Sequence, residues 1–238
     1  MRDAGCGLGY KAKWFSDLAP DSTIIGMDFS ESIYIAADRY MDVENLYFIK
    51  GDIAKTNFDD SSIDYISCDQ VIHHTQDVGK TFKELSRILT NCGELAVYVY
   101  AKKALPRELL DDYFRRAAKD ISHNDMLELS TQLTDLGKTL SDLNIEISVP
   151  DIPLLNIKGG KINLQRFIYW NFIKCFWNDE LGRIGSISTN YDWYSPTNAF
   201  RYSKEEFLEF AKKCNLKQVF LHEEEACYSG RFKKSFFK

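Results

Sequence analysis

The segment Asp3-Ala4-Gly5-Cys6-Gly7-Leu8-Gly9 decides the fold of this chain. Its three glycines alternate with other residues immediately before a helical pattern over 10–18. Glycine lacks the Cβ that would keep a ligand away from the backbone, and the first turn of the following helix presents free N–H groups. The segment is therefore predicted to be a strand-to-helix turn that binds a polar ligand.

The spacing of these glycines separates the possible ligand classes. A dinucleotide-binding loop of the form GxGxxG needs glycine at position 10, where the chain has Tyr10. A nicotinamide cofactor is therefore disfavoured. An oxidoreductase linked to NAD or acting on nucleotide sugars is disfavoured further, because no Tyr-x-x-x-Lys pair lies on a suitable helix. A Walker loop is excluded because no Gly-Lys-Ser/Thr follows the glycines.

The first hundred residues alternate strand-like and helix-like patterns, which is typical of an α/β fold with a parallel sheet and crossover helices. Short runs rich in β-branched and aromatic residues predict strands over 23–27, 46–49, 63–67 and 94–100. The intervening patterns predict helices over 10–18, 32–40 and 78–89. Ser30 is expected to cap the second helix, and a turn at 91–93 is expected to end the third.

The pattern changes in the middle of the chain. Residues 102–196 contain two amphipathic stretches, 106–118 and 126–143, followed by a connector with prolines and glycines. This segment is predicted to be an inserted, mainly helical cap that forms an acceptor-binding region. The main domain then comprises residues 1–101 and 197–238.

The α/β pattern resumes after the cap. Ser203 and Glu206 have the spacing of a capping box at the start of a helix over 203–214. Strands are expected over 216–222 and 227–233, and their short connection requires antiparallel pairing. The expected sheet is therefore mostly parallel, with an antiparallel C-terminal strand.

Composition limits the function classes. The chain has 238 residues, of which 45% are hydrophobic and 27% charged, with a formal net charge of -5. This balance does not favour a broad nucleic-acid surface, and no apolar stretch approaches the roughly 20 residues of a membrane span. The six cysteines form no CxxC pair and no Cys/His spacing suited to zinc, so the expectation is a reduced, cytoplasmic chain without a metal site.

Polar residues follow three further predicted strands. Asp28 comes directly after the second strand, where a carboxylate can accept both hydroxyls of a ribose. Asp52 and Ile53 follow the third strand, where a carboxylate can accept from an exocyclic amine and an aliphatic side chain can cover an adenine. The segment 68–74 follows the fourth strand beside the switch point of the sheet. Four strand ends are thus expected to converge on one cleft.

These motifs, in this order, resemble those of class I S-adenosylmethionine-dependent methyltransferases. The glycine segment resembles the first motif of that family, residues 24–40 its acidic second-strand motif, 48–53 its adenine loop, and 63–74 its fourth-strand motif with a double histidine. The resemblance implies a Rossmann-like, doubly wound sheet and S-adenosyl-L-methionine as cofactor. Family members have a fuller first strand, so the chain is expected to be N-terminally truncated within that strand.

The resemblance also implies roles for individual residues. Three glycines would approach the methionine and ribose portions of the cofactor, supported by one aspartate, and the remaining residues would contact ribose, adenine and the methionyl side in turn. In chain order these residues are Asp3, Gly5, Gly7, Gly9, Asp28, Asp52, Ile53, Asp69 and Gln70.

Five residues are candidates for the acceptor side. His73 and His74 follow the fourth strand, where a histidine can act as a base or cap the following helix. Tyr191, Trp193 and Tyr194 lie near the return of the chain to the main domain. No catalytic residue is assigned, because positioning the acceptor against the sulfonium methyl can suffice.

The implied function is transfer of a methyl group to an oxygen, nitrogen or carbon of a small-molecule or sugar-type acceptor. Residues 191–196 bear a weak similarity to enzymes of bacterial surface-sugar and small-molecule biosynthesis. The alternative is a catalytically inactive S-adenosylmethionine-binding or regulatory protein, which binds the cofactor and forms no product. The oligomeric state stays open.

Overall fold

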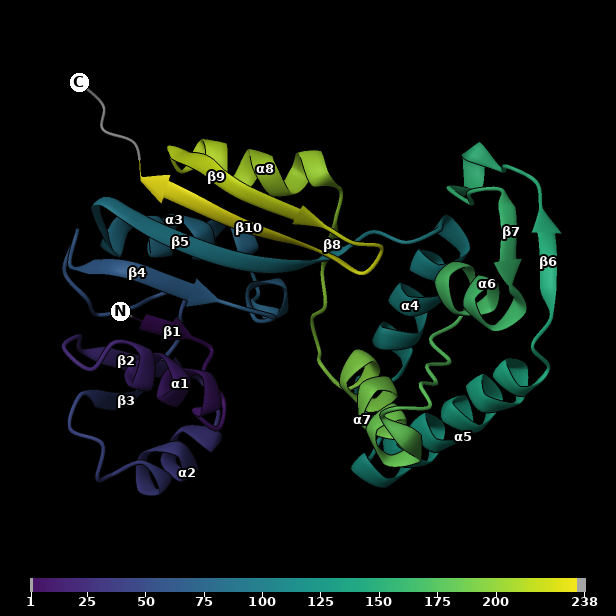
Figure 1. Ribbon diagram of the computed structural model, residues 1–238, viewed down its shortest axis with the longest axis horizontal. Coiled ribbons are helices and arrows are strands. Elements are labelled where there is room, and N and C mark those ends of the chain that lie inside the picture. Colours follow the sequence, from purple (N-terminus) through teal and green to yellow (C-terminus); the bar gives the residue numbers. More distant parts are fainter. Residues whose placement is uncertain (1, 235–238) are drawn as a thin grey trace. The chain divides into compact units, whose positions relative to one another are not determined.

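The computed structural model describes residues 2–234 and divides into two compact units. Met1–Ala101 and Phe200–Lys238 form one unit, here called the sheet unit, and Lys102–Ala199 form the other, here called the helical unit. Figure 1 shows the elements of both. No helix among residues 2–234 combines the length and the apolar character needed to cross a bilayer.

The sheet unit is a mixed sheet with helices. Its strands are β1 (Arg2–Ala4), β2 (Ile24–Asp28), β3 (Leu46–Lys50), β4 (Ile63–Cys68), β5 (Leu89–Ala101), β8 (Arg201–Tyr202), β9 (Leu216–Glu223) and β10 (Cys227–Lys234). Its helices are α1 (Tyr10–Leu18), α2 (Ser32–Arg39), α3 (Val78–Ile88) and α8 (Lys204–Lys213), with a short 3-10 turn at Ile72–His74.

The strand order is β3-β2-β1-β4-β5-β10-β9, and β8 pairs with β5 beside this path. All pairs are parallel except those of β10, which runs antiparallel to both β5 and β9. The chain adds β2 and β3 on one side of β1 and then β4 and β5 on the other side. The strand order therefore reverses between β1 and β4, which is the switch point of the sheet. The predicted α/β class with an antiparallel C-terminal strand is confirmed.

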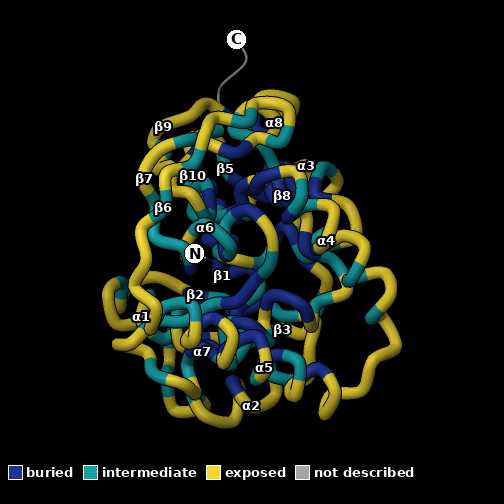
Figure 2. Tube along the Cα trace, turned by 90° about the vertical axis from the view of Figure 1, so that its right-hand side faces the viewer, coloured by how far each residue is buried: buried dark blue, intermediate teal, exposed yellow. Residues whose placement is uncertain are grey.

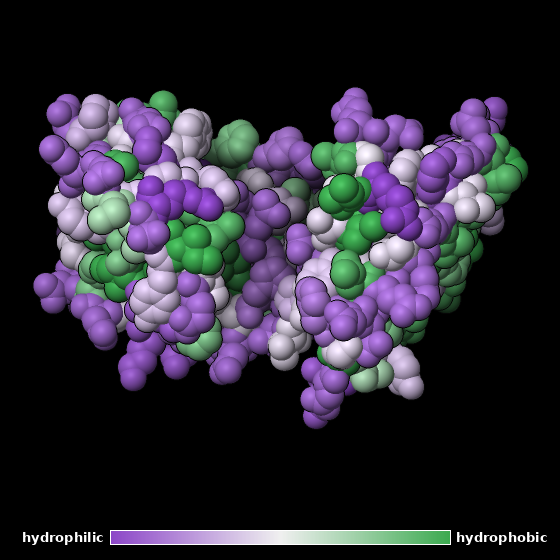
Figure 3. Space-filling model, turned by 90° about the horizontal axis from the view of Figure 1, so that it is seen from below, coloured by the Kyte–Doolittle hydropathy of each residue, from purple (hydrophilic) through white to green (hydrophobic). Residues whose placement is uncertain are grey.

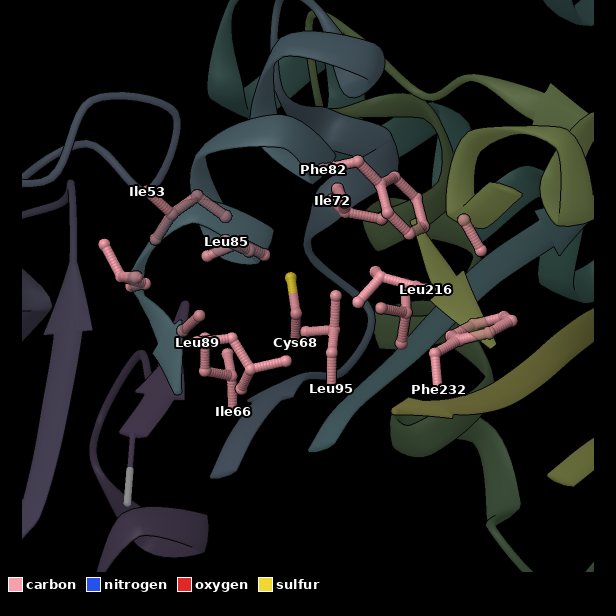
Figure 4. Close-up of a cluster of buried hydrophobic side chains, with 14 of the residues drawn as sticks. Ile53, Ile66, Cys68, Ile72, Phe82, Leu85, Leu89, Leu95, Leu216 and Phe232 are labelled. Carbon is pink, nitrogen blue, oxygen red and sulfur yellow. The ribbon is translucent and has the colours of Figure 1, made fainter. Parts of the chain in front are cut away.

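The main apolar core lies between the sheet and the helices α3 and α8. Phe82 of α3 stacks on Phe210 of α8 with ring centroids 5.5 Å apart, and Phe207 meets Phe232 of β10 at 5.5 Å. Figure 4 shows this cluster, and Figure 2 shows how burial follows the central strands. A smaller core beneath α1 and α2 contains Ala12 and Ile33. Together these cores hold the carboxyl ends of the parallel strands in place.

Two local predictions are wrong. Ser30 does not cap α2, because its hydroxyl donates to Asp28 Oδ1 at 2.7 Å and the residue before the helix is Glu31. Residues 91–93 do not form a separate turn after α3: β5 begins at Leu89 and bulges around Cys92, whose φ is 68°. The capping box of Ser203 and Glu206 is confirmed.

The helical unit is built from α4 (Leu105–Ala117), α5 (His123–Asp142), α6 (Leu164–Asn171) and α7 (Gly182–Tyr194). It also contains an antiparallel hairpin of β6 (Glu146–Val149) and β7 (Gly160–Asn163), joined through a 3-10 turn at Pro153–Leu155. The connector expected from its prolines and glycines is thus partly a hairpin. Figure 3 shows apolar and hydrophilic groups interspersed on the surface of each unit.

Arg2 is a fully buried cation in β1. Its guanidinium lies 4.7 Å from the ring centroid of Phe58, and its Nη2 donates to Met27 Sδ. Nε and Nη1 have no partner among the described residues, and burial lowers the pKa of the side chain to about 10. An unpaired buried cation destabilises a fold because its lost hydration is not replaced.

We expect Arg2→Met to raise the free energy of unfolding of the sheet unit by about 1 to 3 kcal/mol, because an apolar chain of similar length replaces the unpaired donors. Urea denaturation of both proteins measures the change. Arg116→Met, at an exposed site of α4, is the control and should leave the midpoint unchanged. A lower midpoint for Arg2→Met would show that the buried guanidinium stabilises the fold.

Candidate active site

The turn between β1 and α1 is built from residues with left-handed backbone geometry. Gly5, Gly7 and Gly9 have φ values of 83°, 51° and 80°. The amides of Gly5 and Cys6 both donate to the carbonyl of Met27, at 2.7 and 3.1 Å. The turn is thereby fixed against the end of β2.

The three glycines differ in what surrounds them. A Cβ on Gly5 would lie 2.3 Å from a methyl of Val71, and one on Gly9 would lie 2.8 Å from the ring of Phe48. A Cβ on Gly7 would meet no atom within 4 Å. Gly5 and Gly9 are therefore required by packing, whereas Gly7 borders open space.

Asp28, at the end of β2, is hydrogen-bonded to this turn. Its Oδ2 accepts from the amide of Gly7 at 2.8 Å, and its Oδ1 accepts from the amide and hydroxyl of Ser30 at 2.8 and 2.7 Å. A carboxylate offers about four acceptor positions, so these three bonds leave capacity for a further donor. The half-buried carboxylate is thus oriented by the backbone and still able to bind a ligand hydroxyl.

Three carboxylates gather around the turn with one ammonium group. Asp3 is buried and its Oδ2 has no partner among the described residues. Burial raises the pKa of Asp3 to about 6; Lys11 opposes this rise, and the charges of Asp69 and Asp28 add to it. Lys11 itself forms an ion pair with Asp69. The excess of acidic groups favours a ligand that carries positive charge.

The remaining predicted cofactor residues follow β3 and β4. The backbone of Gly51 donates to the carbonyl of Asp28 at 2.9 Å, which places Asp52 at the same sheet edge. Asp52 is exposed and accepts from the amide of Ala54 at 2.8 Å, whereas Ile53 is packed in the main core. Gln70 is exposed, with a φ of 60° that turns the chain so that Val71 packs on Gly5.

His73 and His74 lie in the short turn after β4. His73 is fully buried, with its ring 3.9 Å from that of Tyr100, and neither ring nitrogen has a partner among the described residues. Burial, aided by His74, lowers the pKa of His73 to about 3, so the imidazole is neutral. Neither histidine caps α3, since Asp77 accepts from the amide of Lys80 at 2.9 Å. Within residues 2–234, no group of three or more His, Cys, Asp or Glu side chains is arranged to hold a metal ion.

The three aromatic acceptor candidates all lie on α7 in the helical unit. The indole of Trp193 and the hydroxyl of Tyr194 each donate to the buried carboxylate of Asp111, both at 3.0 Å. Arg107 Nε donates to the same carboxylate at 2.8 Å. Trp193 and Tyr194 therefore belong to an internal network, while Tyr191 lies nearer the surface.

The Arg107–Asp111 pair was not predicted from the sequence. Its only signal is the four-residue spacing on an amphipathic helix, which more often marks a solvent-exposed pair. Here both side chains are at most 1% exposed, because the aromatic residues of α6 and α7 cover them.

Lys174 is a second buried cation in this network. Its Nζ donates to the hydroxyl of Tyr169 at 2.9 Å. Burial, together with the charge of Arg107, lowers the pKa of Lys174 to about 7. Near neutral pH its amine is therefore partly uncharged, unlike a lysine in water.

The depressed pKa of Lys174 predicts a pH-dependent stability. Between pH 7 and about 10.4 the unfolded chain binds a proton at this lysine that the folded chain does not, so the contribution of Lys174 to the free energy of unfolding should rise with pH in this window. Lys174→Met should remove that rise and stabilise the protein at pH 7. Chemical denaturation across this pH window measures the free energy of unfolding of the unchanged protein, of Lys174→Met and of the exposed control Lys138→Met. The prediction is contradicted if this free energy changes with pH to the same extent in all three proteins.

The glycine geometry predicts unequal tolerance to alanine. Gly5→Ala should lower the free energy of unfolding by more than about 2 kcal/mol, because it combines a left-handed φ with a clash against Val71. Gly7→Ala should cost only about 1 kcal/mol, since it meets no neighbour. Thermal denaturation of both variants tests this order, and equal losses would show that the space at Gly7 is not open.

Known methyltransferases resemble this chain in sequence. A family model described as a methyltransferase domain matches residues 2–97. Malonyl-[acyl-carrier protein] O-methyltransferase of Legionella pneumophila is 31% identical over 157 residues, which cover 65% of this chain and 53% of that protein. Sterol 24-C-methyltransferase of Aspergillus fumigatus is 30% identical over 100 residues, covering 40% and 26%. The chain thus spans about half or less of the length of these relatives.

Solved structures share the fold at low identity. An S-adenosylmethionine-dependent methyltransferase from Mesorhizobium loti has a TM-score of 0.57 at 13% identity and covers 98% of this chain and 89% of its own. PKMT2 from Rickettsia typhi, solved in complex with AdoHcy, has a TM-score of 0.62 at 17% identity and covers 97% and 48%. The matched family model identifies residues 2–97 as a methyltransferase domain, and the strand order of the sheet unit belongs to the Rossmann-like fold that these solved structures share.

Proposed function

We propose that this protein binds S-adenosylmethionine at the carboxyl edge of β1, β2, β3 and β4 and transfers its methyl group to a small-molecule or sugar-type acceptor. The observation that carries the proposal is the turn at Gly7, where open space, a free acceptor position on Asp28 and an excess of carboxylates lie together. S-adenosylmethionine is the cofactor of the family whose motifs the sheet unit resembles, and a methyltransferase domain model matches residues 2–97.

The residues present suit this cofactor chemically. The sulfonium and ammonium groups of the cofactor are positive. Among the charged groups that shift the pKa of Asp3, Asp28 and Asp69 are negative and Lys11 is positive, so carboxylates outnumber cations around the turn. The unpaired Oδ2 of Asp3 is a buried acceptor without a protein donor among the described residues. A ligand that supplies a donor or a positive charge there would remove the cost of leaving this oxygen unpaired.

Each cofactor-side residue has a role that its position supports. Gly7 lets the ligand approach the backbone, Gly5 and Gly9 give the turn the shape that this approach needs, and Asp3 holds the turn. Asp28 binds the ribose hydroxyls, since it retains acceptor capacity. Asp52 and Ile53 contact the adenine, the first as an exposed polar group and the second as the apolar wall behind it. Asp69 and Gln70 are assigned to the methionyl side.

The bound cofactor supplies an electrophilic methyl group on a sulfonium. The contribution of the protein is to hold an acceptor atom near this carbon, in line with the bond that breaks, and to exclude water. His73 and His74 are assigned to the acceptor side of the sheet unit; a neutral His73 can accept or donate a hydrogen bond there without carrying charge. Tyr191 is assigned to the acceptor side of the helical unit, and Trp193 and Tyr194 are assigned to the support of that side through their hydrogen bonds to Asp111.

The acceptor class rests on the relatives and on the composition. The two relatives above are named for methylation of malonyl-acyl carrier protein and of a sterol, so acceptors of different chemistry occur among similar chains. The net charge of -5 favours a small acceptor over nucleic acid. All six cysteines lie in the described part and none is in a disulfide, which supports a reducing, cytoplasmic location.

Calorimetric titration with S-adenosylhomocysteine tests the binding site. We expect micromolar affinity, about -8 kcal/mol, and a loss of at least tenfold in Asp28→Asn and in Gly7→Ala. The exposed Asp17→Asn on α1 is the matched control and should bind as the unchanged protein does. Full affinity in Asp28→Asn would place the ligand elsewhere.

Product formation separates the enzyme from an inactive binding protein. Incubation with S-adenosylmethionine and a panel of acyl, sterol, sugar and phenolic acceptors should release S-adenosylhomocysteine with at least one of them. Release with none, by a chain that binds the cofactor, would favour a regulatory protein.

A further inference from the structure

The helical unit contains a cavity of about 180 Å³, and none of the candidate cofactor residues lines it. It is bounded by the C-terminal end of α4, the N-terminal end of α5 and the C-terminal end of α7. The last two helices pack side by side, as Figure 1 shows. A cavity of about 150 Å³ can hold benzene, so this one has room for a small organic ligand.

The side chains that line the cavity include cations and no carboxylate. Arg115, Lys119 and His123 line the cavity, together with hydroxyl groups such as those of Tyr191 and Tyr194, and no Asp or Glu is among the lining residues. The positive end of α5 lies at the same place, but the C-terminal ends of α4 and α7 are negative, so the preference rests on the cationic side chains and not on the helix ends. The interior therefore favours negative charge.

Two of the polar groups are held in fixed positions. The Nδ1 atom of His123 lies 2.7 Å from the hydroxyl oxygen of Tyr191, and their rings meet edge to face at 5.4 Å. The guanidinium of Arg115 donates to the carbonyls of Pro196 and Trp193 at 2.7 and 2.9 Å, at the end of α7. These contacts restrain the side chains before any ligand arrives. Binding would therefore cost little further side-chain conformational entropy.

Carboxylates lie near the cavity but do not line it. Asp120 lies 3.8 Å from the ammonium of Lys119, and Asp125 accepts from the hydroxyl of Ser122 at 2.7 Å. An anion in the cavity would compete with Asp120 for Lys119. The charge of Asp120 should therefore weaken anion binding, which gives a variant expected to bind more tightly.

We propose that this cavity binds a small organic anion, either a carboxylate or a phosphate monoester, through Lys119, Arg115 and the paired Tyr191 and His123. All of these residues lie in the helical unit, and although Tyr191 is also assigned to the acceptor side, the test below measures anion binding alone and needs no methyl transfer. It assigns Tyr191 to a charged ligand rather than to an aromatic wall.

The test uses the full chain and follows the histidine ring signals by NMR at constant ionic strength. The chain has 4 histidines, and His222, which pairs with Glu224 in the sheet unit, serves as the internal reference. Benzoate and phenyl phosphate are the probes for the carboxylate and the phosphate source, and benzyl alcohol is the neutral control. We expect saturable shifts of His123 at millimolar probe and none of His222.

Variants separate specific binding from general charge attraction. Tyr191→Phe and Lys119→Gln should each weaken binding about tenfold, because each removes a hydrogen bond to a charged oxygen, and Asp120→Asn should strengthen it. Lys138→Gln, at an exposed site on α5, the helix of His123, should have no effect on binding. Equal shifts of His123 and His222, or no saturation of His123 with either anion, would overturn the proposal.

Discussion

The two hydrogen bonds from the amides of Gly5 and Cys6 to the carbonyl of Met27 are the constraint on which the candidate site depends. They join the end of β1 to the end of β2 and force the backbone into a conformation that only glycine adopts at low cost. The amide of Gly7 then meets Asp28, and Val71 fills the space beside Gly5. One short turn thus connects three strand ends.

The same turn explains why the site was predictable from sequence. The candidate cofactor residues follow their strands directly, and parallel strands bring their carboxyl ends to one edge. A motif at one strand end therefore predicts the location of the next, so Asp28, Asp52 and Asp69 could be placed from the chain alone. The helix of the capping box at Ser203 was predictable for a similar reason, since its signal is local.

The features that escaped prediction depend on contacts between distant segments. Ser30 has the side chain of a helix cap, but α2 begins one residue later, after Glu31, and the Ser30 hydroxyl instead donates to Asp28 at the end of β2. The neutrality of His73 follows from burial against Tyr100 of β5, which no local pattern records. Asp111 is buried because Arg107, Trp193 and Tyr194 donate to it from two helices far apart in the chain.

The two units differ in the sign of the charge that they offer to a ligand. The sheet unit gathers carboxylates at the β1–α1 turn, whereas the cavity of the helical unit is lined by cationic and hydroxyl groups. Each arrangement restrains polar side chains by hydrogen bonds before a ligand is bound. The ligands proposed above differ accordingly: a positively charged cofactor for the sheet unit and an anion for the helical unit.

The most direct test of the central claim is a crystal structure of the chain with S-adenosylhomocysteine. The account predicts the nucleoside over the β1–α1 turn, with a ribose hydroxyl within hydrogen-bond distance of Asp28 and the two bonds to Met27 intact. A ligand bound at another edge of the sheet, or a turn that loses both bonds to Met27 on binding, would contradict it.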